Sequence, residues 1–254
     1  MYCAGLYEES HGIVANYMYD PITNQTFNLR SKETFWWDGG EPLWVTVQRS
    51  NLKSGVYFWP GSESKVRGLY PNKYFAYNKS VKFEDRVDTV VEWLSNDIDL
   101  AMLYFHEPDS TGHQYGPNSP EVIAKVEEMD TLLGYIVSKI DNASLWDSVN
   151  VLVTSDHGMT EVSTNKLIDL LDYVDKSDIT HAPSYGPVAN IKVKDGKLED
   201  TMRRLSNVSH LTVYRREDVP SYWHYSNNPR ILDIVAVADE HWSIAVVTNF
   251  LLKL

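Results

Sequence analysis

The pattern of apolar and polar positions predicts two successive strand–loop–helix units. The run at 99–105, Asp-Leu-Ala-Met-Leu-Tyr-Phe, is suited to a strand buried on both faces. A polar loop from His106 to Asn118 follows it, and then a helix with Ser119 as N-cap and Pro120 at its first position. Alternate spacings of four and three place the apolar residues of this helix on one face: Val122, Val126, Met129, Leu133, Ile136 and Ile140.

A second strand is predicted over 149–154, followed by the sequence Ser-Asp-His-Gly and by a helix near Lys166 to Val174. Upstream, a helix that includes Phe83, Val87, Val90, Val91 and Leu94 leads into the first strand, and further strands are predicted at 187–193, 211–215 and 231–237. This alternation predicts an α/β fold with a mostly parallel sheet and helices on both faces. Chemistry is then expected at the ends of the strands.

Composition and charge limit the classes of function. The 254 residues are 43% apolar and 23% charged, and no linker is long enough to divide them into two domains. The net charge of −12 argues against binding of long nucleic acids, whereas a small anion is compatible if a metal supplies local positive charge. Cys3 is the only cysteine, so any metal must use His and carboxylate ligands. No apolar run reaches the ~18 residues that a membrane span requires.

Four glycosylation sequons occur, at Asn24, Asn78, Asn142 and Asn207. Glycosylation requires entry into the secretory route, yet the chain begins without the basic and apolar regions of a signal peptide. The alternative interpretation is that the sequons arise by chance in a sequence rich in Asn and Ser. If the sequons are used, they favour an extracellular location and a preceding segment that carries the signal.

Two polar motifs follow the two predicted strands. In the first, Asp109 and His113 converge if the loop makes one tight turn at Gly112; the alternative is a polar loop whose Asp caps a turn. In the second, Asp156 and His157 reach one site only where the chain leaves strand geometry, which the following glycine permits; the alternative is a capped turn.

Together the motifs indicate a metal site. Successive strands are usually neighbours, so two Asp and two His would gather at one edge of the sheet. Such oxygen and imidazole donors suit zinc, and two zinc ions about 4 Å apart can clamp a phosphoryl group. Four ligands are too few for two ions, since each requires about four donors.

Several motifs, in the same order along the chain, resemble the ectonucleotide pyrophosphatase/phosphodiesterases of the alkaline phosphatase superfamily. They are Glu-Glu-Ser-His-Gly-Ile-Val-Ala-Asn (8–16), Met-Tyr-Asp-Pro (18–21), Phe-Trp-Pro-Gly (58–61), Glu-Pro-Asp-Ser-Thr-Gly-His-Gln-Tyr-Gly-Pro (107–117), Thr-Ser-Asp-His-Gly-Met (154–159) and Leu-Asp-Ile-Val-Ala-Val-Ala-Asp-Glu (232–240). The sequence is most similar to the fourth and fifth members of that family. The resemblance implies an alkaline-phosphatase-like fold and hydrolysis of nucleotide phosphodiester or pyrophosphate bonds by a threonine nucleophile and two zinc ions.

The same resemblance implies roles for individual residues. Asp109 and His113 fall on ligands of one zinc, and Asp156 and His157 on ligands of the other. Asn16 falls on a residue that contacts the substrate phosphate. The nucleoside pocket is implied at Leu29, Trp59, Tyr77 and Tyr104, with Tyr77 as the base-stacking face. Without the resemblance, these four side chains read as ordinary core or strand residues. His106 and Glu107 are expected to be surface residues or to lie behind the ligands.

The family pattern continues beyond both ends of this sequence. It places the nucleophilic threonine and a metal-binding Asp upstream of Gly5, and the last zinc ligand after Trp242, where residues 245–254 diverge. We therefore expect residues 1–254 to be a single catalytic domain that is incomplete at both ends, to bind zinc weakly and to turn over slowly.

Two other interpretations stay open. The chain could be a non-catalytic glycoprotein that keeps the fold as a binding surface, or a phosphomonoesterase of the same superfamily, for which Ser110 is a poor candidate nucleophile. The resemblance implies a small nucleotide or dinucleotide substrate (a dinucleoside polyphosphate, NAD or another diester) and a location outside the cell or at its surface. Oligomeric state and membrane attachment are left open.

Overall fold

The computed structural model describes residues 3–246, which form two compact units. The first unit contains Lys32–Met159 with the start of the chain, and the second contains Gly5–Ser31 and the part from Thr160 onward. The expectation of a single domain over 1–254 stays a prediction. Most of the divergent tail, residues 247–254, lies outside the described residues. Among the described residues, no helix is long and apolar enough to cross a membrane.

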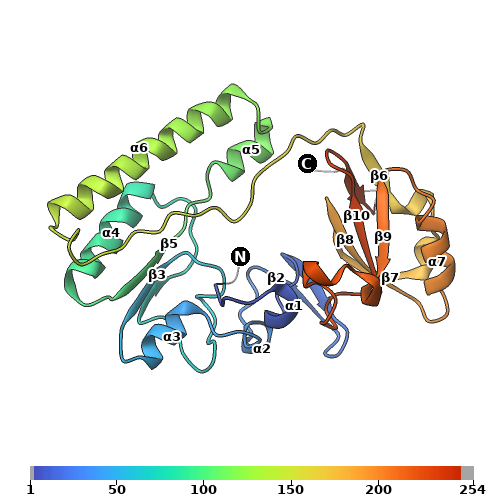
Figure 1. Ribbon diagram of the computed structural model, residues 1–254, viewed down its shortest axis with the longest axis horizontal. Coiled ribbons are helices and arrows are strands. Elements are labelled where there is room, and N and C mark those ends of the chain that lie inside the picture. Colours follow the sequence, from blue (N-terminus) through green and yellow to red (C-terminus); the bar gives the residue numbers. More distant parts are fainter. Residues whose placement is uncertain (1–2, 247–254) are drawn as a thin grey trace. The chain divides into compact units, whose positions relative to one another are not determined.

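The first unit is built on a three-stranded parallel sheet. β3 (Ser54–Tyr57) lies between β4 (Lys73–Phe75) and β5 (Leu100–Leu103), with Ser54 opposite Leu100. The helices are α2 (Thr34–Trp37), α3 (Leu43–Arg49), α4 (Phe83–Asn96), α5 (Asp109–Tyr115) and α6 (Pro120–Asn142). Figure 1 shows α4 and α6 on one side of this sheet and α3 on the other. The predicted α/β class with a parallel sheet covered by helices is therefore confirmed.

Close packing joins α4 to the sheet. All four residues of β3 are buried, and a Cβ added to Gly55 would lie 2.5 Å from the ring of Trp93. Glycine is thus the residue that lets this tryptophan reach the strand backbone. In β5 only Met102 is buried, because within the described chain this strand pairs with β3 alone.

The long helix α6 begins as predicted, but its buried face is rotated. Ser119 Oγ accepts a hydrogen bond from the Val122 amide at 3.2 Å, which makes it a true N-cap. Leu132 and Ile140 are buried against α4, whereas Val126 is 51% exposed. Part of the predicted apolar face therefore lies in solvent.

Two predictions for the first unit are wrong. The expected loop 106–118 contains the helix α5, which places Asp109 and His113, four residues apart, on one helical face. The expected strand 149–154 is not a strand, and Leu152 is 90% exposed. A β-prone sequence forms a strand only against a hydrogen-bonding neighbour, and no described strand pairs with this segment.

The second unit is mainly antiparallel. Its four-stranded sheet has the order β7 (Ile179–Ser184), β8 (Val188–Val193), β10 (Ile234–Ala238), β9 (Leu211–Arg215). Two further pairs are β1 (Tyr17–Asp20) with β2 (Gln25–Asn28), and β6 (Leu167–Asp169) with β11 (Ser243–Ala245). The helices are α1 (Glu8–His11) and α7 (Leu198–Leu205), and short 3-10 turns cover Leu170–Asp172, Lys176–Asp178, Arg216–Asp218 and Ser221–Trp223.

Predicted strands in this unit are confirmed at β8 and β9, and the strand predicted at 231–237 is found as β10. The prediction of a helix near Lys166 to Val174 is wrong. Residues 167–169 instead pair in parallel with β11, and the Asp169 carboxylate accepts the Leu171 amide at 3.0 Å to cap a 3-10 turn. Pairing with a strand more than seventy residues away in the sequence outweighs the local helical pattern.

Polar contacts tie the early and late segments of the second unit together. Arg230 Nε donates to Asp20 Oδ2 at 2.9 Å, and both side chains are largely buried. The Glu9 carboxylate accepts the amides of Ser226 and Asn227 at 2.8 and 2.7 Å. These bonds span more than two hundred residues of sequence, so the unit depends on both ends of the described chain.

Candidate active site

The first ligand pair lies on α5. Asp109 and His113 are four residues apart on this helix, and His113 Nε2 lies 3.3 Å from Asp109 Oδ1. The predicted convergence of this pair is thus found, but helical geometry causes it, rather than a turn at Gly112. Gly112 lacks the positive φ that such a turn would need.

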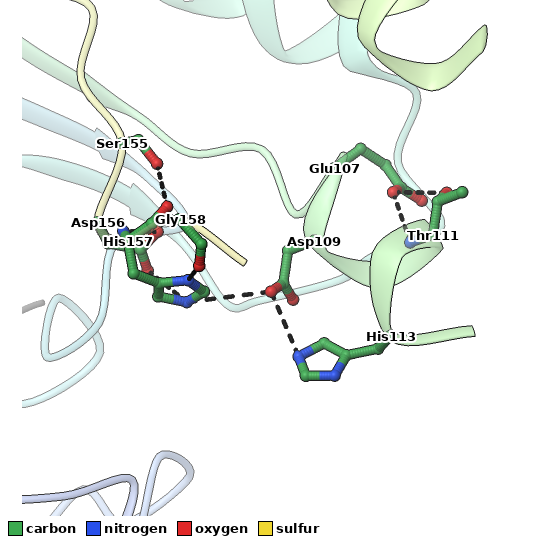
Figure 2. A network of polar contacts seen from close by, with 8 residues as sticks. All are labelled: Glu107, Asp109, Thr111, His113, Ser155, Asp156, His157 and Gly158. Atoms are coloured by element: carbon green, nitrogen blue, oxygen red, sulfur yellow. Dashed lines mark hydrogen bonds and ion pairs between the residues drawn. The ribbon is translucent and has the colours of Figure 1, made fainter. Parts of the chain in front are cut away.

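The second pair approaches the first from an extended segment. His157 Nε2 lies 3.9 Å from Asp109 Oδ1 and 3.8 Å from Asp156 Oδ2. Figure 2 shows the Asp109 carboxylate pointing between the rings of His113 and His157. The structure therefore brings together the four side chains that were predicted to bind metal.

Hydrogen bonding orients the His157 ring. Its Nδ1 lies 2.7 Å from the Gly158 carbonyl oxygen, which can only accept, so Nδ1 carries the proton. In the neutral ring, Nε2 then has a free lone pair, which is the form in which histidine binds metals. Ser155 Oγ also donates to the His157 carbonyl at 2.7 Å and fixes the backbone of the segment.

One oxygen of the Asp109 carboxylate accepts no hydrogen bond within the described chain. Its side chain is 43% exposed, yet Oδ1 itself is buried and receives no hydrogen bond from any described residue. A buried carboxylate oxygen without a donor is costly unless a cation or proton satisfies it. The donor types fit zinc, although within residues 3–246 no three His, Cys, Asp or Glu side chains converge as ligands of one ion. Each ligand pair is thus a partial site.

Two contacts outside the ligand set hold the motifs in place. Glu107 Oε2 accepts the Thr111 amide at 3.0 Å and the Thr111 hydroxyl at 2.8 Å, at the start of α5. A Cβ at Gly112 would lie 2.4 Å from Met159 Sδ, so the missing side chain leaves room for the segment that carries His157. Sequence reasoning missed both contacts, because neither follows a regular capping or periodic pattern.

Aromatic residues of the predicted nucleoside pocket lie beside this cluster. The ring centroids of Tyr77 and Tyr104 are 6.2 Å apart, and Tyr77 is 49% exposed. Burial raises the pKa of Tyr104, and the charges of Tyr77, Asp156 and Asp109 raise it further, which is consistent with a ring close to the acidic cluster. Trp59 is half-buried, and its Nε1 is buried without an acceptor among the described residues.

The two remaining predicted substrate residues belong to the other compact unit. Asn16 is exposed just before β1, and Leu29 is 48% exposed just after β2. Their roles toward a nucleotide stay predictions.

The sequence matches a known family over nearly its whole length. The profile described as type I phosphodiesterase / nucleotide pyrophosphatase covers residues 2–247. The chain belongs to this family. Membership confirms the predicted recognition, and relatives of the chain are named as phosphodiesterases and triphosphatases.

Individual members of this phosphodiesterase family are similar in sequence to this chain. Human ectonucleotide pyrophosphatase/phosphodiesterase family member 5 is 43% identical over 94% of this chain and 51% of its own length. A bis(5′-adenosyl)-triphosphatase of Xenopus laevis is 41% identical over 94% of this chain and 54% of its own length. The chain thus spans about half the length of these two relatives.

Solved structures of the family share the fold. Murine ectonucleotide pyrophosphatase/phosphodiesterase 5 superposes with a TM-score of 0.93 at 42% identity, over 97% of this chain and 68% of that chain. An inactive threonine-to-alanine variant of the same murine protein, in complex with AMP, superposes with the same TM-score of 0.93, over 67% of its chain. The expected alkaline-phosphatase-like architecture is confirmed.

Proposed function

We propose that this chain belongs to a nucleotide pyrophosphatase/phosphodiesterase that hydrolyses phosphodiester or pyrophosphate bonds with two zinc ions. Asp109 and His113 would hold one ion, and Asp156 and His157 the other. The observation that carries the proposal is the buried Asp109 Oδ1, which accepts no hydrogen bond from a described residue and lies 3.3 Å from His113 Nε2 and 3.9 Å from His157 Nε2. A buried carboxylate oxygen without a hydrogen-bond donor, beside two imidazole rings, is stabilised by a nearby cation.

Each residue has a defined task in this proposal. The carboxylates and imidazoles would hold zinc, which would supply Lewis-acid stabilisation of the charge on the phosphoryl oxygens. Tyr77 and Tyr104 would offer ring faces to a nucleobase, with Trp59 as an apolar wall. The part proposed for Leu29 rests on the family resemblance. The Asn16 amide would donate a hydrogen bond to a phosphate oxygen.

The substrate class proposed is a small nucleotide or dinucleotide. One relative is named as a bis(5′-adenosyl)-triphosphatase, and a related structure contains AMP. The charge of −12 disfavours a long nucleic acid. A dinucleoside polyphosphate, NAD or another diester would each release a nucleoside monophosphate, so AMP is the appropriate binding probe.

Zinc binding tests the metal sites. We expect Asp109→Asn and His157→Asn each to weaken zinc affinity by about tenfold or more in equilibrium dialysis, because each removes a donor. Asp147→Asn is the matched control, since Asp147 is exposed and outside the cluster. Zinc affinity equal in all four proteins would overturn the metal assignment.

Competition between AMP and inorganic phosphate tests the nucleotide pocket. A nucleotide phosphodiesterase should bind AMP well above phosphate in the presence of zinc, whereas a phosphomonoesterase should bind the two ligands alike. Binding of neither ligand would favour a non-catalytic glycoprotein that only keeps the fold.

We further propose that the protein acts outside the cell or at its surface as a glycoprotein. The support is that the asparagines of all four sequons are exposed: Asn24, Asn78, Asn142 and Asn207. Oligosaccharides could therefore be attached at each of them without disturbing the core.

A further inference from the structure

Arg86 is a buried cation outside the proposed metal and nucleotide residues. It lies in the first turn of α4 and has no exposed surface. Its Nη1 donates to the Tyr104 carbonyl at 3.0 Å, and its Nε and Nη2 donate to the Val81 carbonyl at 3.2 and 2.9 Å. Within the described part of the chain, no carboxylate lies within ion-pair distance of it.

Aromatic faces take the place of a counter-ion. The guanidinium carbon lies 4.9 Å from the ring centroid of Phe58 and 4.7 Å from that of Phe83. Backbone carbonyls satisfy its hydrogen-bond donors, and the ring quadrupoles offset part of the cost of burying its charge. A planar guanidinium can donate several hydrogen bonds in its plane while it stacks on aromatic rings, so lysine cannot reproduce this arrangement.

The contacts of Arg86 lead directly to the aromatic pair of the proposed pocket. Tyr104 is held through its own carbonyl oxygen. Phe58, whose ring Arg86 covers, meets the Tyr77 ring edge-on at a centroid distance of 5.3 Å. Phe58 also has a φ of 69°, a backbone conformation that a bulky residue keeps only when its surroundings enforce it. Arg86 therefore contacts one tyrosine of the pair directly and the other through one ring.

We propose that Arg86 is a positioning residue that sets the affinity of this site for the nucleobase part of its ligand. It fixes the Tyr77–Tyr104 ring pair and does not itself touch the nucleotide or the metal ligands. The inference rests on the proposed nucleotide function and deepens it. A purely structural role would instead reduce stability and all ligand affinities together.

The test compares a ligand that has a base with one that lacks it. We expect Arg86→Lys, loaded with zinc, to bind AMP about tenfold more weakly, a change equivalent to 1.4 kcal/mol, with affinity for inorganic phosphate within about twofold of the unaltered chain. Arg49→Lys is the matched control, because Arg49 is exposed and pairs with Glu41 at the surface. Isothermal titration gives both affinities, and circular dichroism confirms that each variant is folded.

A second variant keeps the test decisive if Arg86→Lys does not fold. Phe58→Leu leaves the carbonyl contacts of Arg86 intact and removes the ring between it and Tyr77. We expect the same selective loss of AMP affinity. Unchanged AMP affinity in a folded variant, or equal loss of AMP and phosphate affinity, would overturn the inference. If the unaltered chain binds phosphate but not AMP, the proposed nucleotide function fails as well.

Discussion

The Glu107 carboxylate accepts two hydrogen bonds from Thr111, one from its amide and one from its hydroxyl. Both partners lie outside the ligand set, yet they fix the first turn of the helix that carries Asp109 and His113. An unsatisfied amide at a helix N-terminus weakens the whole turn, and the effect is strong in a helix of seven residues. The geometry of the ligand pair thus depends on a residue that the sequence alone placed in a minor role.

Replacement of Glu107 should affect both stability and metal binding. We expect Glu107→Ala to lower the free energy of unfolding by about 1 kcal/mol and zinc affinity by about tenfold, because the first turn of α5 loses its cap. Glu107→Gln keeps one acceptor oxygen and should retain most of both. Glu127→Ala, an exposed change in the middle of α6, is the control. Unaltered zinc affinity in Glu107→Ala would contradict the argument.

Gly112 provides a second test of how the motifs meet. A methyl group there would displace Met159, which lies 2.4 Å from the position of the added Cβ. Because the end of a methionine side chain is flexible, we expect Gly112→Ala to cost about 1 kcal/mol or less, but to weaken zinc affinity. Adding Met159→Ala should restore zinc affinity by making room.

Gly134→Ala is the matched control for this substitution. Nothing lies within 4 Å of a Cβ at position 134, so alanine should stabilise α6 by up to about 1 kcal/mol and leave zinc affinity unchanged. Equal zinc affinities in the Gly112 and Gly134 variants would show that the approach of Met159 does not matter for the site. Titration calorimetry and thermal denaturation supply both quantities.

The buried pair of Asp20 and Arg230 predicts a pH dependence of stability. Burial alone would raise the pKa of Asp20, but hydrogen bonds from Arg230, Thr23 and Ile22 outweigh it, so the pKa is lowered. The carboxylate therefore stabilises the fold fully above the unfolded-state pKa of about 3.9, and this contribution is lost as the pH falls through the lower folded-state pKa.

We expect Asp20→Asn to be destabilised by about 3 kcal/mol at neutral pH, because the buried ion pair between Asp20 and Arg230 is broken. The difference in unfolding free energy from the unaltered chain should shrink once the pH falls below about 4. Urea unfolding of both proteins at a series of pH values measures this difference in unfolding free energy. A difference that stays constant down to the lowest pH would show that the pair does not supply this stability.

Glycosylation can be read from electrophoretic mobility. When the chain is directed into a secretory pathway, we expect treatment with a glycosidase to increase its electrophoretic mobility. Removal of each sequon should increase the mobility of the untreated chain by the contribution of one oligosaccharide. Thr26→Ala is the cleanest change at the first sequon, because Asn24 Oδ1 accepts a hydrogen bond from Tyr19 and is better kept. No mobility shift in the secreted chain would refute the proposed glycoprotein.

Local signals in the sequence predicted those parts of the structure that local interactions determine. Ser119 and Pro120 define the start of α6, and the apolar runs define β8, β9 and β10. The four ligand candidates follow two apolar runs, and the family resemblance favoured them as ligands over the alternative of capped turns. Their grouping was right even though α5 replaces the expected loop and no strand precedes Asp156.

The remaining errors concern pairing at a distance. Residues 167–169 look helical, but they pair with β11, and residues 149–154 look like a strand but have no described partner. The contacts of Arg86 join α4 to Phe58 and Tyr104, and the periodicity within any one element does not predict them. Apolar patterning shows which residues favour burial, whereas the neighbour that covers them is a property of the folded chain.

Residues 149–154 are largely exposed and pair with no described strand, which matters for any preparation of this polypeptide. Its sequence, Val-Asn-Val-Leu-Val-Thr, is β-prone, uncharged and free of proline, and Leu152 and Val153 are 90% and 68% exposed. Such a segment is a template for intermolecular strand pairing and for fibril-like association. The repulsion between chains of charge −12 opposes that association, and salt weakens the repulsion. Low ionic strength is therefore the condition expected to slow this strand-mediated association most.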